Sequence, residues 1–315
     1  MMIPRQGWYA CAVFMVIGFA LAAVLGPKSH TDTHLLWKAT RGSSVLYILG
    51  VSHTVPEEIS KIPAHIMRAF DTSSSYAMES YGVFINNFEP TAARLKRLEK
   101  RPPGSEAPPR AWHFLNQMVS NGDLRPEHAL ELSKASLYGL TSFFKQQTEW
   151  DWYRLATKGQ HAPMAQGLDH QLAVLAKAKN KLTFGLEDSV ARHDFWSSEC
   201  GDEKYYLEYL ESMMHLQKEF GTVSDFKKFY VQIYAGEYEN FAKDYLQLLA
   251  TAAAHRIEFD CSVVPRNKNW VEMIMSLSAA QTNSFIAVGA AHVIGQDSVQ
   301  NLLMQRGFKI ERVWH

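Results

Sequence analysis

Short apolar runs separated by turn-forming residues mark both ends of this chain. Near the start, residues 35–40 and 45–49 are two such runs, and Arg41-Gly42-Ser43 lies between them. Two apolar runs around a glycine-containing turn predict a β-hairpin.

A helical rhythm follows the hairpin. Apolar residues recur at three- and four-residue spacing from Ile59 to Phe70, although Pro63 must kink or restart the helix. The segment SYAMES then reads as a short strand that ends in Glu79. The order strand, strand, helix, strand is typical of an α/β fold.

The middle of the chain changes character. Residues 83–160 and 190–259 carry long helical patterns, and we expect both to be helical insertions. The proline-rich segment 101–110 within the first one predicts an exposed loop. Between the insertions, residues 169–179 predict a helix and residues 182–184 a strand.

The last part of the chain returns to α/β order. Residues 265–280 predict a helix, residues 285–288 a strand, residues 295–307 a second helix with Gly307 at its end, and residues 308–314 a strand. The fold class that follows is α/β (α+β), with one mixed central sheet. Its strands come from the N-terminal, central and C-terminal segments of a single domain over residues 35–315.

The N-terminal residues point to targeting. An uninterrupted apolar run from Trp8 to Leu25 follows a single arginine, so residues 1–26 predict a signal peptide or an N-terminal membrane anchor. Residues 27–34 would be a linker. We therefore expect a secreted, periplasmic or membrane-anchored protein whose domain lies outside the cytoplasm, where Cys200 and Cys261 could form a disulfide.

The charge balance narrows the partners. Lys and Arg together number 32, as do Asp and Glu. A neutral chain offers no electrostatic footprint for nucleic acid or for an anionic membrane surface. We therefore expect no nucleic acid as a partner.

Two segments that lie far apart share one design. Residues 45–49 run into Gly50, two further residues and His53, and residues 285–288 run into Gly289, two small residues and His292. Glycine at a strand end lets the backbone turn sharply or approach a ligand closely. Since sites in α/β sheets gather at the carboxyl ends of strands, both histidines are expected on one rim.

Carboxylates end two other apolar segments. Glu79 follows the SYAM strand, and Glu187 follows the strand at 182–184. Two imidazoles and a carboxylate suit a hydrolytic divalent-metal site, with the second carboxylate as general base. Arg266, at the start of a predicted helix, could clamp an oxyanion or a substrate carboxylate.

Plainer interpretations stand beside this one. A histidine after a strand is often a hydrogen-bonded loop residue, and glutamates at strand ends are often surface residues or helix caps. Asp169, at the start of its helix, reads more simply as an N-cap than as a catalytic acid. The plainer role for Arg266 is an ion pair with an acidic neighbour alone.

The ordered blocks resemble the TraB/GumN family, whose relatives include the Tiki-type metalloproteases. They are LWKAT with SVLYILGVSHT, AMES, GLDHQLAVLAKAKNKLTFGLED, PRNKNWVEMI and SFIAVGAAHVIGQDSVQNLLMQRGFKIERV. The resemblance implies an α/β core with inserted helices and a metal-dependent peptidase outside the membrane. Its motif positions fall on Gly50, His53, Glu79, Asp169, Glu187, Arg266, Asn267, Gly289 and His292.

These observations predict an extracytoplasmic metal-dependent hydrolase that acts on peptide or protein substrates. His53, Glu79 and His292 would hold the metal, with Glu187 and Arg266 as catalytic groups. Manganese, cobalt and zinc all suit such nitrogen and oxygen ligands. The alternative is a non-catalytic protein that sequesters a peptide signal or haem on the same fold.

Overall fold

The computed structural model describes much of residues 35–313 and none of residues 1–34. The longest internal segments outside the described residues are 80–94, 145–163, 188–205 and 211–231. The predicted signal peptide or anchor, the linker and Cys200 therefore lie outside the described part of the chain. Within that part, no helix is long and apolar enough to cross a membrane.

A six-stranded sheet organises the described residues, in the spatial order β6-β4-β7-β2-β1-β8. The strands are β1 Leu35–Arg41, β2 Ser44–Val51, β4 Ser75–Met78, β6 Leu182–Gly185, β7 Ser284–Gly289 and β8 Lys309–Arg312. Strands β6, β4, β7 and β2 are parallel neighbours, whereas β1 is antiparallel to β2 and β8 is antiparallel to β1. The predicted α/β class with a mixed sheet is thus confirmed, including the N-terminal hairpin.

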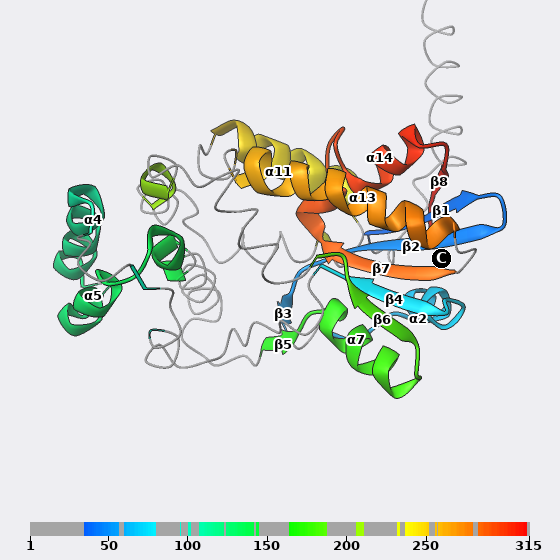
Figure 1. Ribbon diagram of the computed structural model, residues 1–315, viewed down its shortest axis with the longest axis horizontal. Helices are drawn as coiled ribbons and strands as arrows, with labels where there is room; N and C mark the ends of the chain where they lie inside the picture. The colour runs from blue at the N-terminus through cyan, green and yellow to red at the C-terminus, as the bar shows by residue number, and fades with distance from the viewer. Residues whose placement is uncertain are drawn as a thin grey trace, which may run out of the picture.

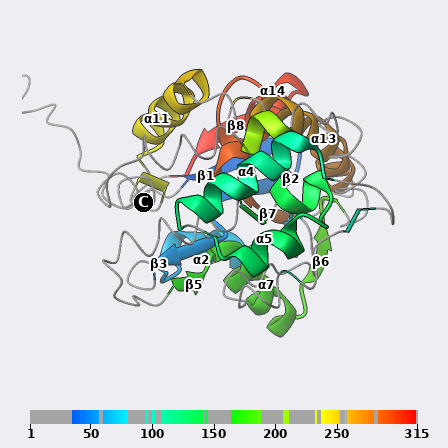
Figure 2. The same cartoon turned by 90° about the vertical axis from the view of Figure 1, so that its left-hand side faces the viewer.

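Helices cover both faces of the sheet (Figures 1 and 2). Helices α13 (Val264–Ala279) and α14 (Val299–Gln305) lie on one side, and α2 (Ala64–Asp71) and α7 (Leu168–Ala178) lie on the other. Phe70 of α2 packs edge-on against Tyr76 and Phe285, at ring-centroid distances of 5.9 and 5.8 Å. The central strands β4 and β7 are accordingly almost fully buried, whereas the edge strands β6 and β8 are partly exposed.

The start of the first helix differs from the prediction. Helix α2 begins only at Ala64, after Pro63, whose ring fixes a backbone angle suited to the position before a first turn. Residues Thr54–Pro56 form strand β3, which pairs antiparallel with β5, Met164–Gln166. The sequence did not predict this two-stranded sheet, because strands of three residues carry too little alternation to be recognised.

Parts of the two helical insertions are described. Helices α4 (Pro109–Ser120) and α5 (Pro126–Leu132) belong to the first insertion, so the last two residues of the expected loop 101–110 are helical. Leu207 and Leu210 of the second insertion pack into the same apolar cluster as these helices. The two insertions therefore share one core, separate from the cluster that surrounds the sheet.

Two further features bear on the C-terminal half. Helix α11 spans Tyr238–Thr251, and a π-helical turn at Phe259–Val263 leads directly into α13. Cys261, within that turn, is disulfide-bonded.

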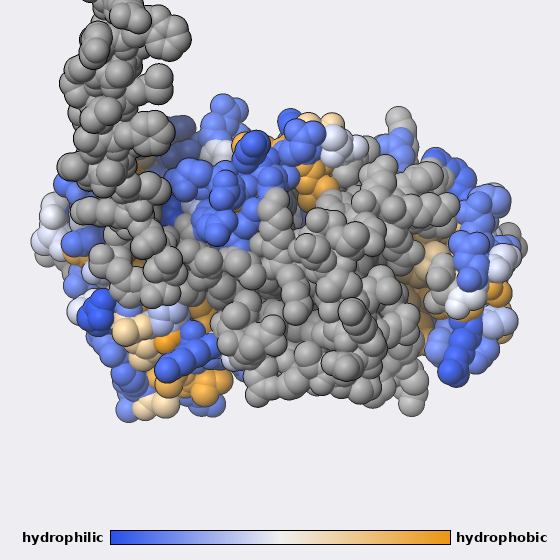
Figure 3. Space-filling model, turned by 180° about the vertical axis from the view of Figure 1, so that it is seen from behind, coloured by the Kyte–Doolittle hydropathy of each residue, from blue (hydrophilic) through white to orange (hydrophobic). Residues whose placement is uncertain are grey.

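Seen from behind, the described surface is mostly hydrophilic, with apolar residues interspersed in small areas (Figure 3).

Candidate functional site

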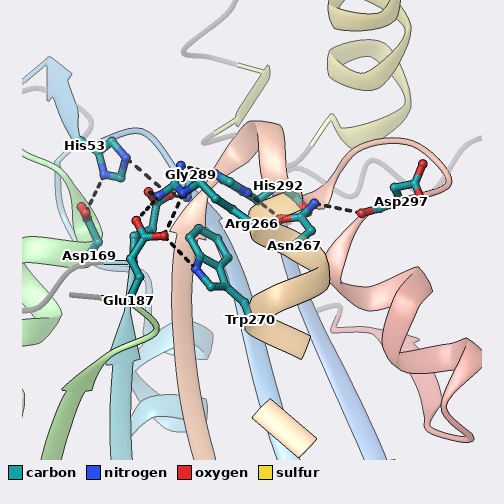
Figure 4. Close-up of polar contacts among 10 residues, drawn as sticks. His53, Asp169, Glu187, Arg266, Asn267, Trp270, Gly289, His292 and Asp297 are labelled. Atoms are coloured by element: carbon teal, nitrogen blue, oxygen red, sulfur yellow. Dashed lines mark hydrogen bonds and ion pairs between the residues drawn. The ribbon is translucent and has the colours of Figure 1, made fainter. Parts of the chain in front are cut away.

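The carboxyl ends of the four parallel strands bring the predicted polar residues to one edge of the sheet (Figure 4). His53 follows β2, Glu79 directly follows β4, Glu187 follows β6, and His292 lies in the short 3₁₀ turn after β7. Strands that run parallel must end on the same side. Residues separated by as many as 239 positions in the sequence thereby become neighbours.

Glu79 lies between the two histidines. Its Oε1 atom is 3.7 Å from Nε2 of His53 and 3.6 Å from Nε2 of His292. The backbone N–H of Gly289 donates to the same oxygen at 2.6 Å. The side chains of Glu79 and His292 are buried, whereas that of His53 is 54% exposed. The site is therefore open on the side of His53.

Oxygen acceptors orient both imidazole rings. Nδ1 of His53 lies 2.7 Å from Oδ2 of Asp169, and Nδ1 of His292 lies 2.6 Å from Oδ1 of Asn267. Each acceptor assigns the ring proton to Nδ1, so the lone pair of each neutral ring is on Nε2. Both lone pairs then point towards Glu79. Histidines that bind a metal have the same arrangement, in which the other ring nitrogen donates a hydrogen bond that orients the ring.

The orientation of the Asn267 amide follows from its other contacts. Its Nδ2 donates to the carbonyl oxygens of His292, at 3.3 Å, and Asp297, at 2.9 Å. Only Oδ1 is then left to face the ring of His292. Asn267 thus ties the 3₁₀ turn to helix α13 and selects the tautomer of His292.

Asp169 is not the N-cap of its helix. Gly167 occupies that position, and Asp169 lies in the first turn of α7, where the helix dipole stabilises a carboxylate. The hydroxyl of Tyr76 donates to the backbone oxygen of Asp169 at 2.6 Å and fixes this turn against β4. The plainer cap interpretation is therefore wrong, because the side chain is directed to His53.

Gly167 brings that helix close to His53. Its N–H donates to the backbone oxygen of His53 at 2.8 Å. A Cβ atom at position 167 would lie 2.1 Å from the backbone oxygen of Ser52, closer than any contact a real side chain makes. The backbones of the two segments can therefore meet only if residue 167 is glycine.

Arg266 joins the two glutamates. Its Nη2 donates to Oε2 of Glu79 at 2.7 Å and to Oε1 of Glu187 at 2.6 Å, and its Nε donates to Oε2 of Glu187 at 3.0 Å. Its Nη1 lies 3.3 Å from Nε2 of His292. Burial alone would lower the pKa of Arg266, but the charges and hydrogen bonds of the two carboxylates outweigh burial and raise that pKa.

Trp270 completes the arrangement one helical turn further along α13. Its Nε1 donates to Oε2 of Glu187 at 3.1 Å. Its ring also lies 4.5 Å from the guanidinium carbon of Arg266 and 4.4 Å from the ring of His292. Tryptophan is well suited to such a position, since its face attracts a cation while its edge donates a hydrogen bond.

These contacts change the expected roles of two residues. Both oxygens of Glu187 accept hydrogen bonds from Arg266, and one also accepts from Trp270, so the carboxylate is fully engaged by protein donors. Arg266 directs its fork of donors to protein carboxylates. The geometry therefore favours positioning roles for both residues over the general base and the oxyanion clamp that the sequence suggested.

The two motif glycines differ in what they do. Both lie within strands, and neither has the positive φ of a sharp turn, so the expectation that they turn the chain was wrong. A Cβ at Gly50 would lie 2.7 Å from Cγ2 of Val293. A Cβ at Gly289 would lie 3.0 Å from Oε1 of Glu79 and 3.5 Å from Nε2 of His53. Gly50 thus permits packing, whereas Gly289 leaves room between the polar side chains.

The spacing of the donor atoms bears on whether they could hold a divalent ion. No group of three or more His, Cys, Asp or Glu side chains among the described residues forms a ready-made metal site. Ligand atoms about 2.1 Å from a four-coordinate ion lie about 3.4 Å apart. The two separations from Glu79 Oε1, 3.7 and 3.6 Å, are slightly wider than that.

The charges of the buried groups fit a divalent cation. Glu79 and Glu187 share one guanidinium, that of Arg266, and a third carboxylate, that of Asp169, faces His53. With both imidazoles neutral, these four side chains sum to two negative charges. Buried charge of one sign is costly, so a divalent ion beside Glu79 would balance it. The donor types and the charge both fit such an ion.

The sequence left two of these residues unremarked. Trp270 follows Arg266 at a spacing of four, which places both on one face of a helix. That spacing was the available signal, yet a tryptophan in a helix usually belongs to the core. Gly167 gave no signal, because the backbone that it must avoid lies more than one hundred residues earlier.

Comparison with known proteins identifies a family. The sequence profile of the TraB/PrgY/gumN family matches residues 35–312, which is nearly the whole chain. No curated protein and no solved structure matches the chain.

Proposed function

The chain belongs to the TraB/PrgY/gumN family, and on that premise we propose that it is a metal-dependent hydrolase that cleaves peptide bonds outside the cytoplasm. The observation that carries the proposal is the convergence of two oriented imidazole Nε2 atoms on Oε1 of Glu79. Two imidazole lone pairs that face a carboxylate oxygen would repel it, and a cation bound between them makes the arrangement favourable.

His53, Glu79 and His292 would hold the ion, which we expect to be manganese, cobalt or zinc. When bound, such an ion activates water and polarises a carbonyl group. Asp169 and Asn267 keep the two rings in the required tautomer. Arg266 donates to the second oxygen of Glu79 and is itself held by Glu187, so that the first oxygen of Glu79 stays directed to the histidines.

The shape of the site indicates how a substrate would enter. His53 is the only one of the three proposed ligands with an exposed side chain, so a peptide would approach from the edge that it occupies. Gly289 presents backbone without a side chain beside the same atoms. An extended main chain could therefore come close to the proposed ion.

Two observations support a location outside the cytoplasm. The apolar run from Trp8 to Leu25 is typical of a signal peptide or an anchor. Cys261 is disulfide-bonded, and disulfides persist mainly in oxidising compartments. The peptide as substrate class rests on the resemblance to the Tiki-type metalloproteases.

The test uses the purified full chain. Metal is removed with a chelator, each of the three ions is restored in turn, and cleavage of a mixed peptide library is followed by mass spectrometry. His53→Ala is compared with wild type, and His113→Ala, an exposed position of α4, is the control. We expect cleavage by wild type and by the control only when an ion is present.

Other outcomes would contradict the proposal. A wild-type protein that binds no divalent ion and behaves like His53→Ala is not a metalloenzyme. Peptide that is retained intact after long incubation would favour sequestration, and a Soret band on titration would favour haem. Of the two motif histidines, His53 is the one open enough to meet a haem, because the side chain of His292 is 5% exposed.

A further inference from the structure

The contacts of Arg266 with the proposed ligands are unequal. Its bonds to Glu79 and Glu187 measure 2.6–3.0 Å, whereas its Nη1 lies 3.3 Å from Nε2 of His292. The His292 contact is therefore the longest and weakest of the four. It also involves the one nitrogen lone pair that a metal ligand would need.

The two oxygens of Glu79 face different partners. Oε2 accepts from Arg266, and Oε1 faces the two imidazole Nε2 atoms and the N–H of Gly289. An ion on the Oε1 side would leave the bonds of Arg266 to both carboxylates intact. It would displace only the hydrogen bond from Nη1 to His292.

We propose that Arg266 is a resident counter-cation that holds Glu79 and His292 in place in the metal-free protein and releases only His292 when a divalent ion binds. The inference rests on the proposed function. Without this cation, the carboxylates of Glu79 and Glu187 would be buried beside each other. With it, an incoming ion must displace a hydrogen bond and accept a positive neighbour, so Arg266 lowers metal affinity while it stabilises the metal-free fold.

Three variants separate these two effects. Arg266→Met removes the charge and retains an apolar stem, and Arg266→Lys retains the charge without the second arm of the fork. Arg306→Met removes an exposed arginine that follows α14 and is paired with Glu272, and it is the control. For each full-length protein, melting is measured after chelation, and the affinity for Mn²⁺ and for Zn²⁺ alone is measured by competition with a chelating dye.

We expect the metal-free Arg266→Met protein to melt well below wild type and below the control. At a temperature where it is folded, it should bind either ion at least about tenfold more tightly, because a like charge within the site is removed. Arg266→Lys should lie between wild type and Arg266→Met in both measurements.

The results separate the inference from the proposed function. Weaker or unchanged metal affinity in folded Arg266→Met would overturn the inference, as would a melting temperature equal to that of the control. If Arg266→Met does not fold, the order of affinities of Arg266→Lys and wild type decides, and equal or weaker binding by the lysine variant overturns the inference. If neither wild type nor any variant binds an ion, the metal-dependent function fails. A loss of metal-free stability in Arg266→Met but not in the control would then still support the role of Arg266 as a counter-cation.

Discussion

Nδ1 of His53 lies 2.7 Å from Oδ2 of Asp169, although the two residues are 116 positions apart in the chain. The first follows a strand of the N-terminal hairpin, and the second lies in the first turn of the helix that begins the central α/β segment. A half-exposed imidazole is thereby anchored to a buried carboxylate. This pair gives the open side of the site a fixed ring orientation.

Replacement of Asp169 by asparagine should change the tautomer of the His53 ring. An amide can offer its N–H₂ to Nδ1, which moves the ring proton of His53 to Nε2. We expect metal affinity to fall by roughly 10–100-fold, as for other losses of outer hydrogen bonds to metal-bound histidines. Titration with Mn²⁺ or Zn²⁺ and nitrogen NMR of the imidazole measure affinity and tautomer.

Asp71→Asn is the matched control for Asp169→Asn, because Asp71 is an exposed aspartate paired with Lys179. Its affinity and its spectra should equal those of wild type. An unchanged affinity in Asp169→Asn, with the protein folded, would mean that the His53 contact serves stability alone.

Replacement of Asn267 by leucine should weaken both the fold and the site. Asn267 is completely buried, and its loss leaves the Nδ1–H of His292 and two backbone carbonyls without this partner. We expect a loss of about 2–4 kcal/mol in the free energy of unfolding, since buried unsatisfied groups cost about 1–3 kcal/mol each. Urea denaturation measures the free energy of unfolding. Asn240→Leu, on the exposed face of α11, is the control.

Alanine at the two motif glycines should have opposite effects. Gly50→Ala pushes a methyl group into Val293 and Leu35 and should cost about 1–3 kcal/mol of stability, with less effect on metal binding. Gly289→Ala places the methyl group beside Glu79 and His53 and should reduce metal affinity roughly tenfold or more with a smaller loss of stability. Thermal melting and metal titration of both variants measure the two effects. A larger loss of affinity in Gly50→Ala and a larger loss of stability in Gly289→Ala would contradict the prediction.

Trp270→Phe should isolate the hydrogen bond to Glu187. Phenylalanine keeps a ring beside Arg266 and His292 but has no N–H to donate. We expect the free energy of unfolding to fall by about 1.5–3 kcal/mol, the range for a hydrogen bond to a charged group. Chemical denaturation measures this loss, and Trp270→Ala, which also removes the ring contacts, should lose more. A loss in Trp270→Ala with none in Trp270→Phe would assign the whole effect to packing.

The sequence predicted the strands of the main sheet because each is an apolar run with a clear end. It also predicted that polar residues at those ends would lie on one edge, since parallel strands share their direction. Glu79 and His292 could therefore be selected as neighbours from sequence alone. The third neighbour, His53, was selected in the same way.

Tertiary contacts explain what the sequence could not supply. The methyl group that Gly50 must lack would collide with Val293, and nothing near Gly50 in the sequence indicates that contact. The hydrogen bonds that occupy Glu187 come from Arg266 and Trp270, on a helix some eighty residues away. The position of each strand along the chain is a local signal, whereas the role of a carboxylate depends on which donors reach it.

Strand β7 lies between β2 and β4, although it is the last of the three to be synthesised. The N-terminal strands therefore cannot form their final neighbours until Ser284–Gly289 has left the ribosome. Sheets that depend on such distant pairing fold slowly, because long loops must close before the contacts repay them. A chain that ends before Ser284 would contain His53 and Glu79 but no central strand to bring them together, so a shortened product should be degraded instead of retaining partial activity.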